Sequence, residues 1–301
     1  MTAERLNHVD FRDQISKNKL KSFVLVFLIF IVFLIFGYVI SMAFEPGLFL
    51  IIMILSVIVS IGYILLTYYK SDKIAIASSG AKPASREKYR EFYNLVEGLT
   101  IASGLPMPQL FIIESNEINA FASGRNPGKA VVAVTTGALE KLDKRELEGV
   151  LAHELGHVGN YDIRFMTLVA VMVGMIAIIS EIFLRSLWFS GGDSDNKGNV
   201  IFLIIGIVLA ILAPIVVQIV QLSISRKREY SADATAVKFT RNPQGLIGAL
   251  KKIKKDYEGI EGGKKIRVTK SMAPLYFANP FREIFSTHPD INKRISVLEA
   301  M

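Results

Sequence analysis

Four long apolar stretches constrain this chain more than any other feature of its sequence. They cover residues 23–44, 48–69, 165–187 and 200–222, and within them only Glu181 and Arg185 are charged. Each stretch is long enough, at about 1.5 Å per helical residue, to cross a hydrocarbon layer of about 30 Å. We therefore predict four transmembrane helices. The alternative for the last two is a buried hairpin, although helices that are apolar on every side are rare in a small soluble protein.

The positions of lysine and arginine indicate how these spans are oriented. Basic residues precede the first span and follow the second and the fourth, whereas the two opposite connections, 45–47 and 188–199, contain only Lys197. Cytoplasmic loops carry such an excess, so we expect both termini and both polar blocks in the cytoplasm. The net charge of +8 follows mostly from this topology, with the lipid bilayer as a partner and no nucleic acid.

The polar residues outside the spans form two blocks. Neither block alone has the size of a complete domain, but together they match a common domain size. We predict an N-terminal tail with two spans at 1–69 and the first part of a domain at 70–164. A transmembrane hairpin at 165–222 then splits this domain, and its second part occupies 223–301.

Local patterns in the first polar block mix helices with short strands. An amphipathic helix is predicted over 85–103, and strands over 109–113, 120–123 and 130–134. Asp143, followed three residues later by Glu146, is typical of a capping box that begins a helix. The expected fold class is therefore α+β, mainly helical with a small β-sheet.

The helix that begins there contains His153, Glu154 and His157 in the pattern His-Glu-x-x-His. Two histidines four positions apart lie on one face of a helix, so both rings can bind one ion. The chain has no cysteine, and zinc accepts nitrogen and carboxylate ligands in tetrahedral geometry. Glu154 is placed to take a proton from a zinc-bound water and return it to a leaving amine. The alternative is a core helix with two chance histidines.

A catalytic zinc ion needs a third protein ligand. The metzincin continuation is excluded because Asn160 and Ile163 stand where glycine and histidine would be required. A downstream carboxylate and His288 remain candidates. Glu229 is favoured because it follows the fourth span about as closely as the histidine pair precedes the third, at heights of about 10 and 12 Å above the same membrane face. The alternative is that Glu229 is a surface acid in a basic segment.

Asp233 lies four residues after Glu229, on the same helical face. Its carboxylate could accept the free N–H of His153 or His157 and thereby fix the tautomer of that ring. Asn160 and Asp162 follow the histidine helix and could shape the site, although a hinge or cap leading into the third span is the favoured interpretation.

Three separated motifs resemble one family: His153–His157, Glu229–Asp233, and Thr287–Pro289 with Arg294 after it. In this order they resemble the HtpX-type integral-membrane zinc metalloproteases, relatives of the CAAX prenyl proteases. The resemblance implies a gluzincin-like (zincin-like) protease domain with one catalytic Zn²⁺. It implies that His153, His157 and Glu229 bind the zinc, that Glu154 is the base, and that Asp233 supports the ligands.

The resemblance also implies a place and a role in the cell. It points to a multi-pass protein of a bacterial or archaeal inner membrane with a cytoplasmic active site. The implied role is quality control under stress, by cleavage of misfolded or unassembled membrane proteins and unfolded polypeptides. Other membrane proteases of quality control are candidate partners.

Two further regions are assigned by the same resemblance together with chemical reasoning. His288 could donate a hydrogen bond to the oxyanion of the tetrahedral intermediate, and Arg294 could order the same segment. The alternative for His288 is a helix-entry residue before Pro289. A segment of mostly small residues resembles the edge strand that holds an extended substrate, although an ordinary core strand is equally consistent with it; its residues are Asn119, Ala120, Phe121 and Ala122.

Two rival functions remain at this stage. A CAAX-type prenyl-protein protease would use the same chemistry, although this chain has fewer predicted spans than that branch. A transporter or membrane scaffold with a structural zinc is the non-enzymatic alternative, and it predicts a closed site with four protein ligands. Only three good ligands are visible in the sequence.

Overall fold

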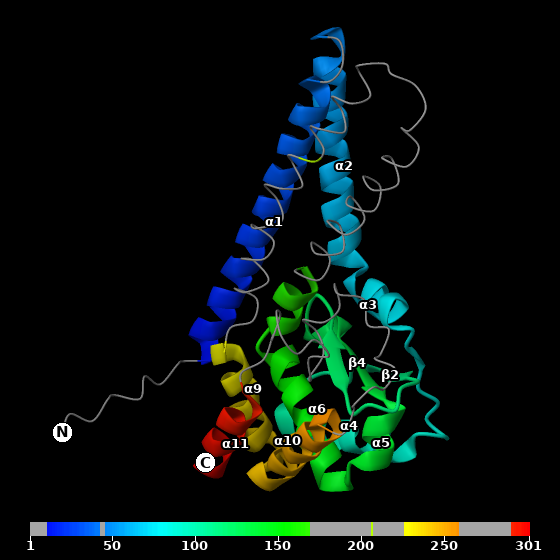
Figure 1. Ribbon diagram of the computed structural model, residues 1–301, viewed down its shortest axis with the longest axis vertical. Coiled ribbons are helices and arrows are strands. Elements are labelled where there is room, and N and C mark those ends of the chain that lie inside the picture. The colour runs from blue at the N-terminus through cyan, green and yellow to red at the C-terminus, as the bar shows by residue number, and fades with distance from the viewer. Residues whose placement is uncertain (1–10, 43–45, 169–205, 207–225, 259–289) are drawn as a thin grey trace, which may run out of the picture.

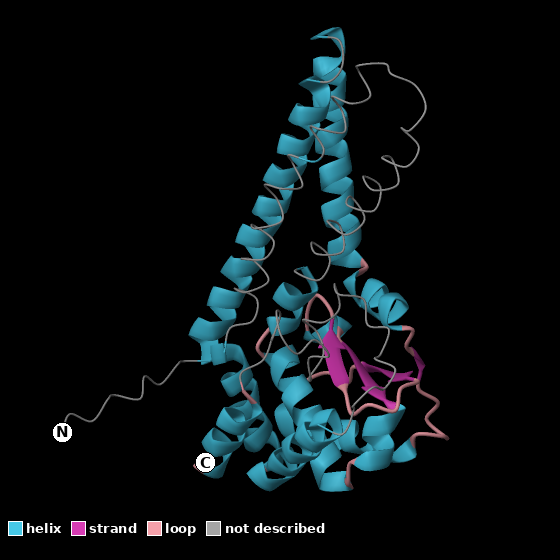
Figure 2. Cartoon of the chain, in the orientation of Figure 1, coloured by secondary structure: helices cyan, strands magenta, loops and turns pink. Residues whose placement is uncertain are grey.

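The computed structural model describes residues 11–42, 46–168, 206, 226–258 and 290–301. A pair of long helices projects from a body of helices and strands (Figure 1). The body is mainly helical and includes one small mixed sheet, which confirms the predicted α+β class at that level (Figure 2).

The projecting pair consists of α1 (Phe11–Met42) and α2 (Phe49–Tyr69), joined by a short 3-10 turn, η1 (Pro46–Leu48). They pack closely at Gly37, where a Cβ would collide with the side chain of Ser56. Most of the large apolar side chains that are exposed in the described part of the chain lie on these two helices. Such a surface suits a hydrocarbon environment better than water.

Among the described residues, α2 is the one helix long and apolar enough to cross a membrane, and 6% of its apolar stretch is buried. The first predicted span, 23–44, lies within α1 as far as Met42, and the apolar section of that helix, Ser22–Ile35, is shorter than α2. The third and fourth predicted spans lie almost entirely outside the described residues. The prediction of four transmembrane helices is therefore confirmed only as far as one candidate span.

A short helix, α3 (Ser71–Ser79), leads from α2 to the sheet, whose strand order is β1-β2-β4-β3. Its strands are β1 (Lys82–Pro83), β2 (Gln109–Ile113), β3 (Ala120–Ser123) and β4 (Val131–Thr135). Strand β4 pairs in parallel with β2 and antiparallel with β3, so β3 lies at one edge.

The local predictions for this region agree closely with the structure. Strands β2 and β3 have the expected bounds, and β4 is displaced by one residue; a 3-10 turn, η2 (Pro127–Lys129), joins the two antiparallel strands. Helix α4 (Arg90–Ser103) begins later than the predicted residue 85, and ends at Gly104, whose φ of 71° suits a glycine C-cap. After β4, α5 (Thr136–Lys141) leads to α6 (Lys144–Gly159).

Helix α6 lies at the centre of the body and begins with the predicted capping box. The Asp143 side chain accepts from two backbone N–H groups, and Glu146 reaches back to the Asp143 N–H. The helix packs against α4, β3, α9 (Arg226–Thr240) and α10 (Pro243–Glu258), and α11 (Ile291–Glu299) packs against α9 and α10. One hydrophobic core thus includes residues from both polar blocks.

Two glycines let neighbouring helices approach α6 closely. A Cβ added at Gly149 would lie 2.5 Å from the Leu246 nitrogen of α10. A Cβ added at Gly156 would lie 3.2 Å from the Ala232 carbonyl oxygen of α9. The second contact brings the backbone of α9 beside the turn of α6 between the two histidines.

The end of α2 is tied to the body by aromatic and cationic side chains. The guanidinium of Arg125, in the β3–β4 connection, lies 4.8 Å from the centroid of Tyr69. Arg164 lies 5.7 Å from the centroid of Tyr68 and donates to the Arg125 carbonyl oxygen. These contacts place the end of the apolar helix close to the turn beside β3.

Candidate metal centre

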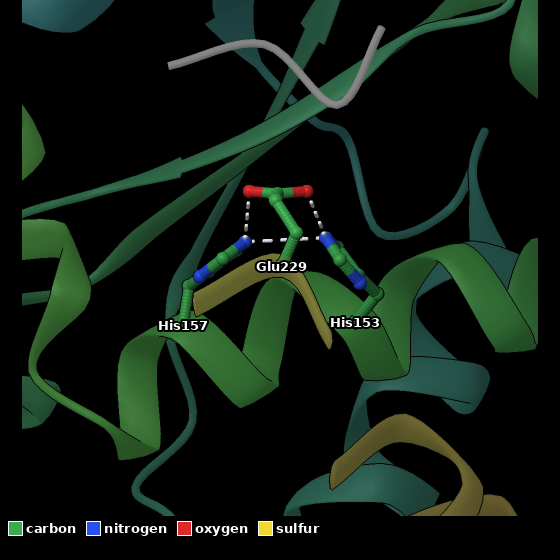
Figure 3. Close-up of side chains that lie close together, drawn as sticks. All are labelled: His153, His157 and Glu229. Atoms are coloured by element: carbon green, nitrogen blue, oxygen red, sulfur yellow. Dashed lines mark hydrogen bonds and ion pairs between the residues drawn. The ribbon is translucent and has the colours of Figure 1, made fainter. Parts of the chain in front are cut away.

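Helix α6 presents His153 and His157 toward the first turn of α9, where Glu229 meets them (Figure 3). Within the described part of the chain, these three side chains form the one group of His, Cys, Asp and Glu close enough to hold a metal ion. All three are buried, with exposed fractions of 0%, 4% and 4%. The carboxylate expected from beyond the third and fourth predicted spans is therefore beside both rings.

The distances within this group match those around a tetrahedral metal ion. The two Nε2 atoms are 3.1 Å apart, and the Glu229 carboxylate oxygens lie 3.6 Å from His153 Nε2 and 3.5 Å from His157 Nε2. Ligands about 2.0–2.1 Å from a tetrahedral zinc would be about 3.3 Å from one another. The three donors therefore need little movement to surround one ion.

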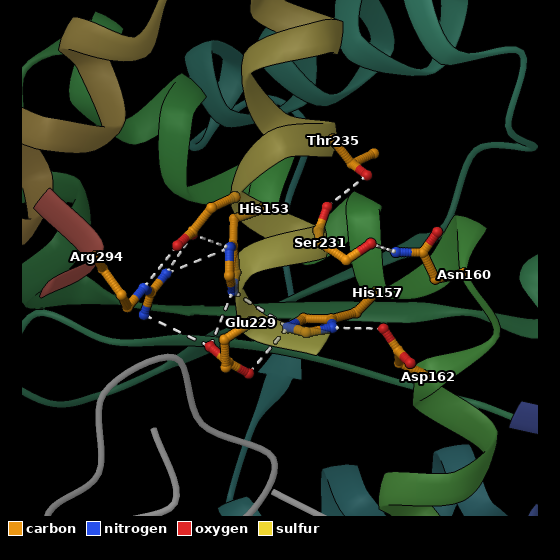
Figure 4. A network of polar contacts seen from close by, with 9 residues as sticks. His153, His157, Asn160, Asp162, Glu229, Ser231, Thr235 and Arg294 are labelled. Atoms are coloured by element: carbon orange, nitrogen blue, oxygen red, sulfur yellow. Dashed lines mark hydrogen bonds and ion pairs between the residues drawn. The ribbon is translucent and has the colours of Figure 1, made fainter. Parts of the chain in front are cut away.

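His153 is oriented by two residues of the second polar block (Figure 4). Its Nδ1 lies 2.9 Å from Asp233 Oδ1. Arg294 of α11 donates to both oxygens of that carboxylate, from Nε at 2.9 Å and from Nη2 at 2.6 Å. The Arg294 guanidinium also lies 3.5 Å from Glu229 Oε2, so it contacts the third member of the group as well.

His157 is oriented by a residue that follows α6 in the chain. Asp162 is fully buried, and its Oδ2 lies 3.1 Å from His157 Nδ1. Arg228 of α9 approaches the other Asp162 oxygen at 3.6 Å. Both histidines therefore present Nδ1 to a carboxylate, which keeps a proton on Nδ1 and turns Nε2 of each ring into the cluster.

The surroundings of the two histidines move their pKa values in opposite directions. Burial lowers the pKa of His153 to about 4, although the Asp233 carboxylate opposes this shift. Burial also disfavours a charged His157, but the hydrogen bond to Asp162 and the charge of Glu229 outweigh it and raise the pKa of His157 to about 9. At neutral pH the His157 ring of the metal-free cluster is therefore protonated on both nitrogens. Its Nε2–H faces the Nε2 lone pair of His153.

This donor set fits a divalent metal ion. Two imidazole nitrogens and a carboxylate converge on one point, where their lone pairs would repel one another without a proton or a cation between them. Nitrogen and carboxylate donors are those that zinc accepts. Glu154 lies next to His153 in α6 and is 2% exposed, which places a second carboxylate beside the group.

The other predicted site residues have different outcomes. His288 lies outside the described residues, so its predicted role is not tested. Asn119 is fully buried, and the residues after it form β3, which packs against α6 as an edge strand of the sheet. Arg294 lies in the cluster itself, where it contacts the supporting carboxylate.

Asp162 is a residue of this cluster that the favoured interpretation as a hinge or cap missed. Asn160 does cap α6, and its side chain reaches Ser231 Oγ at 3.5 Å. Tyr161 then takes a φ of 60°, which reverses the chain and returns Asp162 to the ring of His157. An acid five residues after the second histidine of the pair was the available signal, but a continuous helix would have directed its side chain elsewhere.

Comparison with known proteins agrees with this arrangement. A family model described as Peptidase family M48 matches residues 87–301, which is more than half of the chain. The chain belongs to peptidase family M48. It is therefore a metallopeptidase, as the motif and the cluster indicated.

Curated relatives in this family match almost the full length of this M48 peptidase. A protein named Protease HtpX homolog from Dictyoglomus thermophilum is 39% identical over 295 residues, covering 97% of this chain and 95% of the relative. One of the same name from Tropheryma whipplei is 41% identical over 293 residues, covering 95% and 97%. The resemblance to HtpX-type proteases is thus confirmed.

A solved structure shows the same fold. The crystal structure of S. mikatae Ste24p matches 94% of this M48 peptidase with a TM-score of 0.51 and 21% sequence identity. This chain spans 65% of the length of that protein. The fold is therefore shared with a protein that is only distantly similar in sequence.

Proposed function

We propose that this M48 peptidase is a zinc-dependent endopeptidase of a bacterial or archaeal inner membrane that cleaves misfolded or unassembled membrane proteins at the cytoplasmic face. The single observation that carries the proposal is the convergence of two α6 histidines and Glu229 at tetrahedral ligand spacing. The HtpX homologues and the apolar helix α2 support the membrane setting.

Each residue of the cluster has a distinct role in this proposal. His153, His157 and Glu229 would hold Zn²⁺, which when bound polarises a scissile carbonyl and activates a water molecule. Glu154 accepts the proton of the attacking water and passes it to the leaving amine. Asp233 and Arg294 keep the His153 ring in the tautomer that leaves Nε2 free to bind metal.

The substrate is proposed to bind along β3 as an added strand. In the antiparallel ladder, Thr135 N–H donates to the Asn119 carbonyl oxygen. Backbone hydrogen-bonding direction alternates along a strand, so the polar groups of Ala120 and Ala122 point away from β4. An extended peptide could pair with them beside α6, and it would be recognised mainly through its backbone. His288 is proposed to assist the oxyanion.

We also propose how the chain crosses the membrane. The domain formed by 70–164 and 223–301 would be split by a hairpin at 165–222, with 1–69 supplying the first two spans. The shared core of the two polar blocks supports one split domain. The distribution of basic residues supports four spans with cytoplasmic termini and a cytoplasmic active site. Misfolded proteins in the same bilayer would then meet the site near the membrane surface.

The proposal is tested with Glu154→Gln in the full-length protein in detergent. We expect this variant to bind zinc like the unchanged protein but to lose cleavage of an unfolded membrane protein, because the amide cannot accept the proton. Glu148→Gln, a half-buried residue of the same helix, is the matched control and should retain cleavage. Full activity in Glu154→Gln would refute the assignment.

A second measurement addresses the substrate. Cleavage of an unfolded membrane protein is compared with cleavage of a prenylated CAAX-type peptide at equal concentration. We expect a higher kcat/KM for the unfolded membrane protein, because an edge strand reads backbone and not a prenyl group. Faster cleavage of the prenylated peptide would support the alternative CAAX-type function. Membership of a peptidase family already decides against a transporter or scaffold.

A further inference from the structure

Asp162 lies where the chain leaves α6, and it returns to the metal cluster. The left-handed backbone at Tyr161 turns the chain, and residue 162 begins the next helical segment, 162–168. The Asp162 side chain is fully buried against His157, with 3.1 Å between Oδ2 and Nδ1. Burying a carboxylate in this way is costly unless it has strong polar partners, so its position requires an explanation.

The second partner of Asp162 is Arg228, which belongs to the second polar block. Arg228 is 4% exposed and brings Nε to 3.6 Å from Asp162 Oδ1. Its guanidinium lies 4.2 Å from the centroid of Phe165, so it also contacts the first turn after Asp162. Arg228 precedes Glu229 directly in α9. A movement of Arg228 is therefore a movement of the third member of the cluster.

We propose that Asp162 is a positioning residue of the zinc site and that it acts on two ligands at once. Its carboxylate holds the His157 ring in the tautomer and orientation that direct Nε2 at the ion. Through Arg228 it fixes the start of α9, so that Glu229 arrives beside the two histidines. The Asp162–Arg228 pair thereby joins the two halves of the site, which are separated in the sequence by residues 163–227. This role rests on the proposed function, because it requires zinc in the cluster.

The experiment measures zinc affinity rather than activity. The full-length metal-free protein is titrated with zinc against a competing chromophoric chelator, for the unchanged protein and for Asp162→Asn and Asp162→Ala. Removal of a carboxylate that orients a ligand histidine costs about 10–100-fold in metal affinity. We expect Asp162→Ala to lose affinity in that range, and Asp162→Asn to lose less because its amide oxygen can still accept from Nδ1.

The matched control is Asp256→Ala, which removes a carboxylate that pairs with Lys141 and not with a ligand histidine. We expect this variant to bind zinc as the unchanged protein does. A cobalt-substituted sample of each protein supplies a second reading, since the visible spectrum of Co²⁺ reports the geometry of its ligands. The spectrum should change in the Asp162 variants and remain unchanged in Asp256→Ala.

Arg228→Gln tests the connection to Glu229. Because Arg228 acts through Asp162, we expect a smaller loss of zinc affinity than in Asp162→Ala. In the double variant Asp162→Ala/Arg228→Gln, the loss should be less than the product of the two separate losses, since the pair acts as a unit. Independent, fully multiplicative losses would overturn the proposed link between the two residues.

The outcomes separate this inference from the proposed function. If zinc binds the unchanged protein and is lost in His157→Ala, while Asp162→Ala and Asp162→Asn bind within twofold of the unchanged protein, only the role of Asp162 is overturned. If His157→Ala binds zinc as tightly as the unchanged protein, the proposed zinc site itself fails. A variant whose melting temperature falls while its zinc affinity and cobalt spectrum stay unchanged shows a structural residue and also overturns the inference.

Discussion

The two histidines of the cluster stand four residues apart on one helix, yet they are supported by different parts of the chain. His153 depends on Asp233 and on Arg294, which holds both oxygens of that carboxylate at 2.9 and 2.6 Å. His157 depends on Asp162, from the turn that follows its own helix, with Arg228 at the longer distance of 3.6 Å. One ring is therefore correctly placed only when the C-terminal helices dock, whereas the other is held largely by local chain geometry.

The electrostatic surroundings of the two rings differ in the same way. Burial beside the charge of Arg294 keeps His153 neutral, and the pKa falls to about 4. Despite burial, Asp162 and Glu229 raise the pKa of His157 to about 9. The metal-free site thus holds its proton asymmetrically, and a bound cation would have to displace it from His157.

The largest expected loss of stability follows from removing Asp233, the carboxylate that supports His153 and pairs with Arg294. In Asp233→Ala, Arg294 would remain buried at 1% exposure without its bidentate partner. Breaking such a pair costs about 3–5 kcal/mol of the free energy of unfolding. Chemical denaturation of the metal-free protein in detergent measures this loss. Replacing the arginine as well, in Asp233→Ala/Arg294→Met, should restore part of the stability, and a double variant no more stable than Asp233→Ala would contradict the pairing argument.

The second prediction concerns the proton on His157. Because its pKa is raised, this proton stabilises the metal-free protein below about pH 6.5, and the contribution is lost as the pH rises to about 9. Zinc must displace the same proton, so zinc affinity should rise about tenfold per pH unit across this range and then level off. Chelator competition at several pH values measures the slope. A zinc affinity that is independent of pH from 7 to 9 would contradict the raised pKa of His157 and hence the difference between the two rings.

A third change displaces the helix without touching either carboxylate. In Gly149→Ala the new methyl group would meet the α10 backbone at Leu246, and overpacking of this kind costs about 1–3 kcal/mol. Thermal unfolding in detergent measures this destabilisation. The pH dependence of zinc affinity should remain, since both histidines move with the helix. Loss of that dependence would show that helix packing, and not the separate carboxylates, distinguishes the two sides.

The smallest effect is expected at the beginning of α6. Asp143→Ala removes the side-chain acceptor for the Arg145 and Glu146 N–H groups and should cost about 1 kcal/mol of stability. Asp143→Asn keeps an N-cap acceptor and should recover most of it. Hydrogen exchange in the first turn of α6 measures the local opening. Greater exchange at His153 and His157 than in the first turn would place the weak point of the helix elsewhere.

Several features were predictable because their signals are local. The strand at 109–113, the strand at 120–123 and the capping box at Asp143 depend on neighbours in the sequence, and the structure has all three. The histidine pair follows from helical spacing alone. The expected level of Glu229 came from its sequence distance to an apolar stretch, and the structure places its carboxylate beside both Nε2 atoms.

Other features required the folded chain. Arg294 reaches Asp233 only because α11 docks against α9, and helix docking depends on the complementary shapes of distant segments. Asp162 reaches His157 only because Tyr161 adopts a left-handed backbone conformation. A tyrosine rarely adopts this conformation, and nothing in the sequence indicated it.

The sequence by itself determined the kind of chemistry, because two histidines around a glutamate on one helix can converge on little except a metal ion. It also determined the apolar helix α2, since a run of 21 uncharged residues is long enough to cross a membrane and suits few other environments. The tertiary structure alone decided which carboxylate serves which histidine. Hydrogen bonds of about 3 Å depend on backbone turns and helix crossings, and neither follows from residue type or spacing.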